Sequence, residues 1–190
     1  HVVFAVDRAG LVGADGETHQ GIFDVPYLRT VPGLRLLAPS SFAELRRGLE
    51  QALLREKGPV AIRYPRGGEG AFTGDTFDRT AALLRGGDDV VLCTYGILVN
   101  KALAAAEKLA AEGINAAVVK INDLSAWDRE AVLGPIRACG RVLVLEDCVE
   151  TGSFGQELAS ELASRGISAR MHLCNVGDRF VPQGKVDELY

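Results

Sequence analysis

Short apolar runs alternate with amphipathic helical segments along the chain, and this alternation constrains the fold more than any other feature. The run Val2–Val6 (VVFAV) is continuously apolar, which is typical of a strand buried on both faces of a sheet. Ser41 and Glu44 form a capping box, S-x-x-E, which predicts a helix that ends before Gly58. Strands and helices that alternate at this spacing predict an α/β fold with a parallel sheet and helices on both faces. The predicted strands are residues 2–6, 34–38, 60–64, 89–95, 116–121, 141–145 and 168–174, and the predicted helices are residues 24–30, 42–57, 98–112, 128–138 and 155–164.

A glycine-rich stretch divides this alternation into two series. Residues 67–80 (GGEGAFTGDTFDRT) contain four glycines and show no apolar period, so they predict a linker between domains. We therefore expect a first α/β unit in residues 1–67, a linker in residues 68–86 and a second α/β unit in residues 87–190. A chain of 190 residues is long enough for one large domain or two small ones.

The composition excludes several classes of protein. No apolar run approaches the roughly eighteen residues of a membrane span, and no signal peptide is visible. The formal net charge of −4 argues against general nucleic-acid binding. Residues 1–67 alone carry two more Lys and Arg than Asp and Glu, which suits a small anionic substrate. The four cysteines form no CxxC pair and predict buried, reduced thiols in a cytosolic protein rather than a zinc site: Cys93, Cys139, Cys148 and Cys174.

The stretch from residue 7 to residue 21 (DRAGLVGADGETHQG) places charged and polar side chains directly after the first predicted strand. Ligands of open α/β sheets bind beyond the carboxyl ends of the strands, so Arg8, Asp15 and His19 are candidate site residues. Simpler interpretations stand beside this one, because Arg8 could pair with Asp7 and Asp15 could begin a common Asp-Gly turn. His19 is harder to explain structurally, since it belongs neither to a helix face nor to a core pattern.

Polar groups also follow two other predicted strands. Arg66 comes after a strand and a proline, and its simpler interpretation is a surface residue that pairs with Glu69. Residues 146–148 (EDC) follow the predicted strand 141–145. Residues 151–157 (TGSFGQE) could form a phosphate cradle at a helix N-terminus. A Ser153 N-cap is the simpler account, because the spacing of a GxGxxG motif or a P-loop is absent.

The stretch at residues 7–29, DRAGLVGADGETHQGIFDVPYLR, resembles the 1-deoxy-D-xylulose-5-phosphate synthase family. Members of this family are thiamine-diphosphate enzymes of the transketolase superfamily. The resemblance continues through APS at residues 38–40, RYPRG at 63–67, GSFG at 152–155 and DRFVPQG at 178–184. It covers nearly the whole chain but only part of the family's three domains. The implied parts are the second half of the domain that holds the cofactor's pyrimidine ring and most of the C-terminal domain.

The resemblance also implies a role for each candidate residue. Arg8 and Arg66 match the two arginines that bind the phosphate of glyceraldehyde 3-phosphate. Asp15 matches the aspartate that contacts the hydroxyl of this acceptor, and His19 matches the histidine near the pyruvate-derived adduct. The implied reaction condenses pyruvate with glyceraldehyde 3-phosphate and releases carbon dioxide. A guanidinium fork suits a phosphate, and an imidazole can move protons at neutral pH.

The family uses thiamine diphosphate and Mg²⁺, and the resemblance implies that both are anchored mainly by residues upstream of His1. We expect no metal ligand in this chain, no activity of the chain alone, and a homodimer that needs the N-terminal domain. A cytoplasmic location is expected, with a plastid left open because an upstream segment is compatible with a chain that begins at His1. One departure is visible: residues 121–128 read INDLSAWD where the family has a K-P-L-D type segment, which bears on subunit packing more than on chemistry.

Two other interpretations stay open. The chain could be a transketolase-like subunit or the beta-type subunit of a 2-oxoacid dehydrogenase, which share the fold but lack DRAG and RYPRG together. It could also be a non-catalytic dimerisation and assembly module, because the cofactor-anchoring domain is absent from it. None of the three interpretations involves nucleic acid or a membrane.

Overall fold

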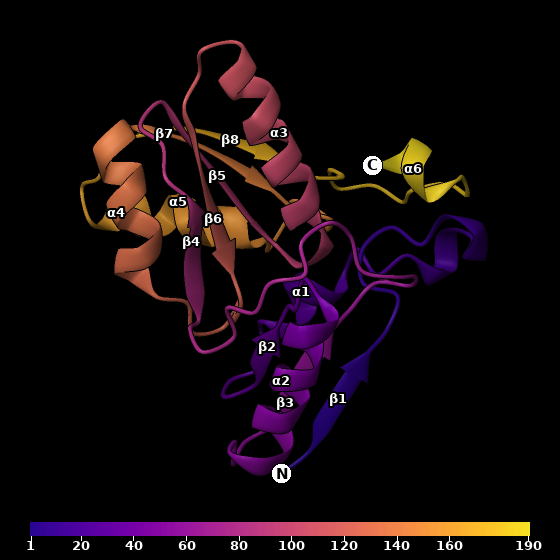
Figure 1. The fold of residues 1–190 in the computed structure, drawn as a ribbon. Helices are drawn as coiled ribbons and strands as arrows, with labels where there is room; N and C mark the ends of the chain where they lie inside the picture. Colours follow the sequence, from indigo (N-terminus) through magenta and orange to yellow (C-terminus); the bar gives the residue numbers. More distant parts are fainter.

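The chain folds around two sheets, a smaller one in the lower part of Figure 1 and a larger one in the upper part. This computed structural model describes residues 1–190, except for the side chain of Ala14. The smaller sheet has the strand order β1-β3-β2, and the larger sheet has the order β4-β6-β5-β7-β8. Every pair of neighbouring strands is parallel except β4 and β6. The predicted α/β fold with parallel sheets is therefore confirmed.

The smaller part contains β1 (Val3–Val6), α1 (Asp24–Leu28), β2 (Arg35–Leu37), α2 (Phe42–Leu54) and β3 (Val60–Arg63). The larger part contains β4 (Ala81–Arg85), β5 (Val90–Tyr95), α3 (Val99–Ala111), β6 (Ala116–Ile121), α4 (Arg129–Cys139), β7 (Arg141–Leu145), α5 (Phe154–Ser164) and β8 (Arg170–Cys174). A last short helix, α6 (Val186–Leu189), follows. The strand β4 lies within the predicted linker and was not predicted, because its antiparallel pairing with β6 rather than a local sequence pattern makes it a strand. The division into domains at residues 67 and 87 stays a prediction.

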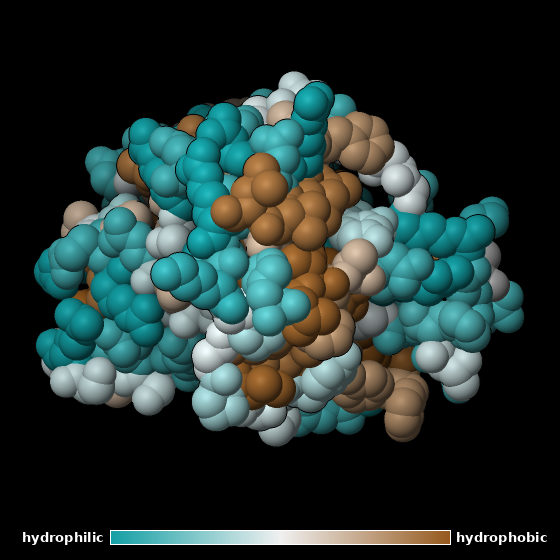
Figure 2. Space-filling model, turned by 90° about the horizontal axis from the view of Figure 1, so that it is seen from below, coloured by the Kyte–Doolittle hydropathy of each residue, from teal (hydrophilic) through white to brown (hydrophobic). Residues whose placement is uncertain are grey.

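The strand β1 is an edge strand, which corrects the prediction of a strand buried on both faces. It pairs with β3 alone, in a register that places Val6 beside Arg63. Val2 is 46% exposed and Phe4 is 47% exposed. The central position belongs to β3, whose four residues are all buried. Figure 2 views the molecule from this end, and a band of apolar side chains crosses the surface there.

Helices begin where the predicted capping residues stand. The hydroxyl of Ser41 accepts a hydrogen bond from the backbone N–H of Glu44 (3.2 Å) at the start of α2. The hydroxyl of Ser153 accepts one from the N–H of Gln156 (3.3 Å) at the start of α5, as the simpler interpretation predicted. Among the described residues, no helix is long and apolar enough to cross a membrane.

Backbone hydrogen bonds join the two parts of the molecule. The segment that follows β6 runs along the edge of β2 that β3 leaves free. Leu124 N–H donates to the carbonyl of Leu36 (2.8 Å), and Ala38 N–H donates to the carbonyl of Asn122 (2.9 Å). The smaller sheet thus continues into a segment of the larger part, although no further strand is formed.

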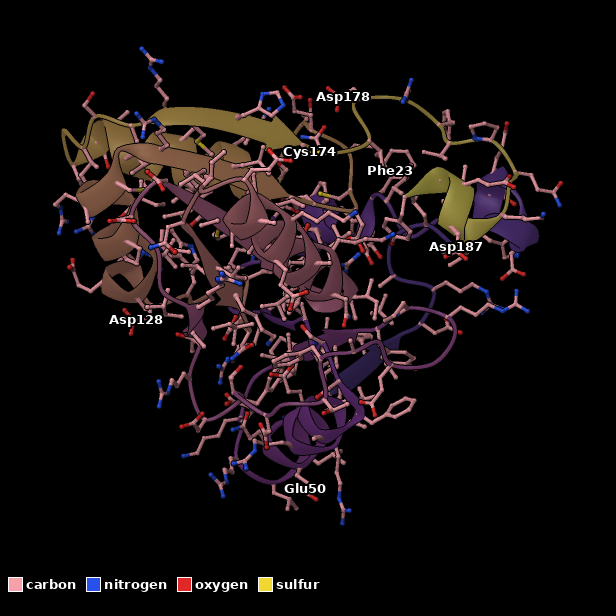
Figure 3. All side chains as sticks on the ribbon, turned by 45° about the horizontal axis from the view of Figure 1, so that its top comes forward. Phe23, Glu50, Asp128, Cys174, Asp178 and Asp187 are labelled. Atoms are coloured by element: carbon pink, nitrogen blue, oxygen red, sulfur yellow. The ribbon has the colours of Figure 1, made fainter. Side chains whose placement is uncertain are left out.

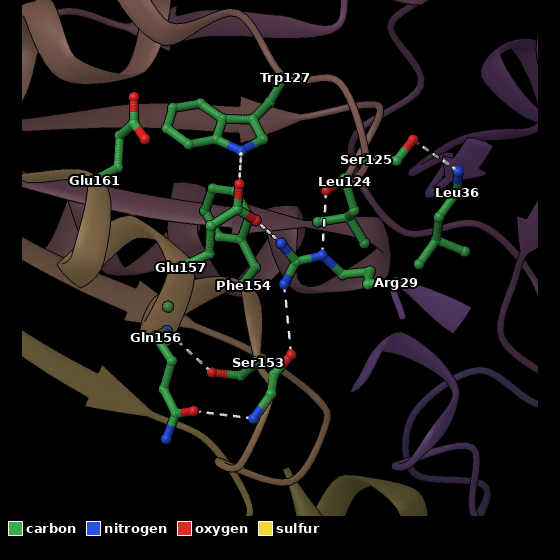
Figure 4. Close-up of polar contacts among 12 residues, drawn as sticks. Arg29, Leu36, Leu124, Ser125, Trp127, Ser153, Phe154, Gln156, Glu157 and Glu161 are labelled. Atoms are coloured by element: carbon green, nitrogen blue, oxygen red, sulfur yellow. Dashed lines mark hydrogen bonds and ion pairs between the residues drawn. The ribbon is translucent and has the colours of Figure 1, made fainter. Parts of the chain in front are cut away.

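Arg29 reinforces this seam from the end of α1 (Figure 4). Its Nε donates to the carbonyl of Leu124 (3.2 Å), and its guanidinium pairs with Glu157. Glu157 also accepts a hydrogen bond from the indole N–H of Trp127 (3.0 Å), and Trp127 packs edge-on against Phe154. The INDLSAWD departure from the family pattern therefore packs the two parts of this chain together.

The cysteines are all free, but the prediction that they are buried holds for only two of them. Cys93 and Cys148 are buried, whereas Cys139 is half-buried and Cys174 is exposed. Figure 3 labels Cys174, the last residue of β8. β8 is an edge strand in which alternate residues face outward, which explains the exposed thiol.

Candidate functional site

The loop that follows β1 is closed by a pair of backbone hydrogen bonds between glycines. Gly10 N–H donates to the carbonyl of Gly21 (3.1 Å), and Gly21 N–H donates to the carbonyl of Gly10 (2.8 Å). A Cβ on Gly21 would lie 2.1 Å from the carbonyl oxygen of Arg8, so only glycine fits there. Arg8 itself has φ +60°, a left-handed conformation that is costly outside glycine and is typical of functional loops.

Arg8 and Arg66 converge on one carboxylate. The strands β1 and β3 are parallel neighbours, so both residues leave the same edge of the sheet. Arg8 Nε donates to Oδ2 of Asp15 (2.9 Å), and Arg66 pairs with the other carboxylate oxygen. Hydrogen bonds from Arg8, and next from Arg66, hold the pKa of the Asp15 carboxyl below its ordinary value. The structure therefore brings together three of the four residues that the sequence singled out.

Of the simpler interpretations, those of Arg8 and Asp15 hold in part, and that of Arg66 does not. Arg8 does pair with Asp7 (2.6 Å), as one of them predicted, but it contacts Asp15 as well. Arg66 pairs with Asp15 instead of Glu69, whose carboxylate accepts the N–H of Phe42 (2.8 Å). Asp15 does lie in a turn, but its side chain also bridges Arg8, 7 residues away in sequence, and Arg66, 51 residues away.

The side chain of His19 lies on the same loop but forms no hydrogen bond or ion pair with the three other candidates. Its Nδ1 is 3.0 Å from the hydroxyl of Thr18, and the residue is exposed. Its backbone N–H donates to the carbonyl of Gly16 (3.2 Å), which places it in the turn directly after Asp15. Its proposed role near a pyruvate-derived group stays a prediction.

A cleft borders Arg66 where the two parts of the molecule meet. Its volume is about 270 Å³, and its lining includes Leu11, Arg66, Lys101 and Tyr190. The helix α6 packs beside the turn at residues 13–15, so the end of the chain forms one wall near the loop (Figures 1 and 3). The hydroxyl of Tyr190 accepts a hydrogen bond from Leu11 N–H (3.1 Å).

Arg63 is a buried charged residue beneath the site that was not predicted as a site residue. Its side chain is 1% exposed and pairs with Asp24 (3.1 Å) and Asp147 (3.0 Å). Burial alone lowers the pKa of Arg63, but the charges of Asp147 and Asp24 outweigh it and raise that pKa. An arginine as the last residue of a fully apolar strand is a signal for such a buried ion pair, because a buried charge is seldom unpaired.

Residues 146–148 serve the structure rather than a ligand. The carboxylate of Glu146 accepts the N–H groups of Phe154 (3.0 Å) and Gly155 (2.9 Å) at the start of α5. Burial raises the pKa of Glu146. An internal carboxylate thus occupies the helix N-terminus that could otherwise have held a phosphate. Cys148 is buried beside the hydroxyl of Tyr95 (3.3 Å).

The described residues do not fit the diphosphate-and-metal end of thiamine diphosphate. The described part of the chain contains no cluster of three or more His, Cys, Asp or Glu side chains that could hold a metal ion. The N-terminus of α5 is occupied by the carboxylate of Glu146. The expectation that this cofactor is anchored by other residues stays a prediction.

Comparison with known protein families decides the affiliation. Residues 79–190 match the family described as "Transketolase, C-terminal domain", and residues 1–68 match "Transketolase, pyrimidine binding domain". The chain belongs to the transketolase family. The loop with Arg8, Asp15 and His19, together with Arg66, falls in the pyrimidine-binding part, and the cleft lies where this part meets the C-terminal part.

Similar curated proteins include 1-deoxy-D-xylulose-5-phosphate synthases. The enzyme of Geobacter sulfurreducens is 41% identical over 99% of this chain, and that of Thermomicrobium roseum is 43% identical over 94% of it. The chain spans about 30% of the length of these curated relatives.

A solved structure described as "Split gene transketolase, inactive beta4 tetramer" has the same fold. It superposes on 99% of this chain with a TM-score of 0.86 and is 30% identical, while the chain covers 60% of it. The expected combination of a pyrimidine-binding part with a transketolase C-terminal part is therefore confirmed by sequence and by structure.

Proposed function

We propose that this chain forms the acceptor-binding part of a 1-deoxy-D-xylulose-5-phosphate synthase. The convergence of Arg8 and Arg66 on one carboxylate carries the proposal, because two guanidinium groups from separate strand ends meet at one anion-sized position. Such forks bind a phosphate through paired, charge-assisted hydrogen bonds. In the proposed reaction, this phosphate belongs to glyceraldehyde 3-phosphate, which condenses with pyruvate as carbon dioxide is released.

The other two candidates have separate roles in this proposal. Asp15 accepts a hydrogen bond from the acceptor's hydroxyl. His19 moves protons near the pyruvate-derived group. Support for His19 comes from its exposure and from the use of its Nδ1 by Thr18, which leaves Nε2 without a hydrogen-bond partner among the described side chains.

Thiamine diphosphate and Mg²⁺ belong to the proposed enzyme, held by residues other than those described here. The match to a pyrimidine-binding domain supports the use of thiamine diphosphate. We expect the 190-residue chain alone to be inactive. We expect the complete enzyme to be cytoplasmic and to work as a homodimer. Turnover of pyruvate and glyceraldehyde 3-phosphate by the isolated chain, supplied with thiamine diphosphate and Mg²⁺, would contradict the first of these expectations.

Calorimetric titration of the chain with glycerol 3-phosphate tests the phosphate site. Arg8→Lys and Arg66→Lys keep the charge but remove the fork, so each should weaken binding roughly ten- to a hundredfold. Arg79→Lys is the matched control, because Arg79 is 69% exposed and pairs with Asp78 away from the site. A wild-type chain that does not bind glycerol 3-phosphate would favour the non-catalytic assembly module instead.

A further inference from the structure

The carboxylate of Asp15 stands where the proposed phosphate would bind. Each of its two oxygens is used by a different arginine, Oδ2 by Arg8 and Oδ1 by Arg66. Its side chain is 19% exposed, whereas that of Asp7, the other partner of Arg8, is 60% exposed. Asp15 therefore sits inside the pair of arginines, and Asp7 sits outside it.

Asp15 occupies a donor on each arginine, so a further anion cannot bind complete forks of both at once. Arg8 donates Nε to Asp15 and a terminal nitrogen to Asp7, so its donors are divided between two carboxylates. Arg66 donates a terminal nitrogen to Asp15. The two positive charges of the arginines are also balanced by the two negative charges of Asp7 and Asp15. A phosphate that contacts both arginines gains paired hydrogen bonds from each, and an uncompensated positive site, only when Asp15 withdraws.

The backbone leaves room for such a withdrawal on the Gly16 side of Asp15, whereas Gly13 packs against the carbonyl of Gly184. Asp15 ends a short 3-10 turn, Gly13–Asp15, and glycines stand at both ends of the turn. Gly13 has φ +58° and Gly16 has φ +88°, values that glycine adopts without the strain of other residues. A Cβ on Gly16 would meet no atom within 4 Å, so the space beside the turn is open.

We propose that Asp15 is a resident anion that holds Arg8 and Arg66 together in the free protein and is displaced by the phosphate of the ligand. This inference rests on the proposed function. Once displaced, the same carboxylate is released beside the bound ligand, where a hydroxyl of a phosphorylated hydroxy-compound can donate to it. Inorganic phosphate displaces Asp15 without offering that compensation, so the site favours phosphorylated hydroxy-compounds over phosphate itself.

Titration with inorganic phosphate tests the displacement. Asp15→Asn removes the competing anion, and we expect it to bind phosphate roughly three- to tenfold more tightly than the wild type. Asp78→Asn is the matched control, since it makes the same change in net charge at an exposed pair with Arg79. Equal or weaker binding by Asp15→Asn, or equal tightening by Asp78→Asn, overturns the inference.

Two further measurements separate this inference from the proposed function. Asp15→Ser, whose hydroxyl is too short to bridge both arginines, should also tighten binding, and it replaces Asp15→Asn if that variant unfolds at a lower temperature. Wild-type phosphate binding that Arg8→Lys and Arg66→Lys weaken, combined with no tightening in either Asp15 variant, retains the phosphate site and overturns the displacement. A wild-type chain that binds neither phosphate nor glycerol 3-phosphate overturns both.

Discussion

Arg63 and Asp147 form an ion pair of 3.0 Å in which both side chains are at most 2% exposed. Arg63 ends β3 in the smaller part of the molecule, and Asp147 follows β7 in the larger part. The pair therefore joins the two parts beneath the loop that carries the candidate site. A Cβ on Gly10 of this loop would lie 2.3 Å from the Asp147 carboxylate, so loop and ion pair are in direct contact.

Replacing Arg63 with Met should destabilise the protein strongly. The substitution leaves the buried carboxylates of Asp24 and Asp147 without their cation, which costs about 3–5 kcal/mol. Urea denaturation measures the free energy of unfolding. The control, Arg79→Met at an exposed pair, should change this free energy by less than about 0.5 kcal/mol. Equal effects of the two variants would show that the buried pair does not join the two parts.

Arg29→Met tests the seam drawn in Figure 4. The guanidinium of Arg29 is 14% exposed and contacts Glu157 and the carbonyl of Leu124, so its loss should cost about 1.5–3 kcal/mol. Arg46→Met is the matched control, because Arg46 is 84% exposed and pairs with Glu50 on the surface of α2. If the two variants unfold at the same urea concentration, the seam adds no stability.

Lys120 gives the stability of the chain a dependence on alkaline pH. It is fully buried, 2.9 Å from Glu44, and burial lowers its pKa from 10.5 to about 8, against the opposing charge of Glu44. Between these two values the unfolded chain binds the proton and the folded chain does not, so stability rises with pH. The free energy of unfolding of the wild type should increase relative to Lys120→Met by up to about 3 kcal/mol between pH 8 and 10.5.

Denaturation of the wild type and Lys120→Met in parallel, at several pH values, cancels the titration of the rest of the chain. A difference between them that is constant across this window, or that falls as the pH rises, would show that Lys120 keeps its proton in the folded state.

The exposed edge of β1 should make the isolated chain associate. An apolar edge strand presents unpaired N–H and C=O groups to other chains, and Phe4 adds exposed apolar surface. Sedimentation equilibrium should show a mass that grows with concentration, and Phe4→Lys should shift it toward the monomer. Phe42→Lys, at a residue that is 56% exposed at the start of α2, should leave it unchanged. A wild type that stays monomeric at every concentration would refute the prediction.

The sequence predicts local structure well and long-range placement poorly. The bounds of β6 and β7 agree with their apolar runs, and Ser153 caps α5 as its position before the helix indicates. The exposure of β1 could not be predicted, because an apolar run does not say which strand takes the centre of a sheet. The buried ion pairs of Arg63 could not be predicted for a related reason, since its partners lie 39 and 84 residues away in sequence.

The candidate site was predicted in part. Motif resemblance named Arg8, Asp15, His19 and Arg66, and the parallel pairing of β1 with β3 explains why the two arginines meet. That Asp15 would bridge them could not be predicted, because the bridge depends on how the loop folds back after residue 10. The sequence also did not predict where His19 lies relative to the arginines, and in the structure it forms no hydrogen bond with them.

A crystal structure of this chain with inorganic phosphate tests whether Arg8 and Arg66 form one phosphate site, although 58 positions separate them in the sequence. We expect one phosphate within hydrogen-bonding distance, about 2.7–3.2 Å, of both guanidinium groups. A phosphate bound to only one of the two arginines, or bound elsewhere while Asp15 still bridges both, would contradict it.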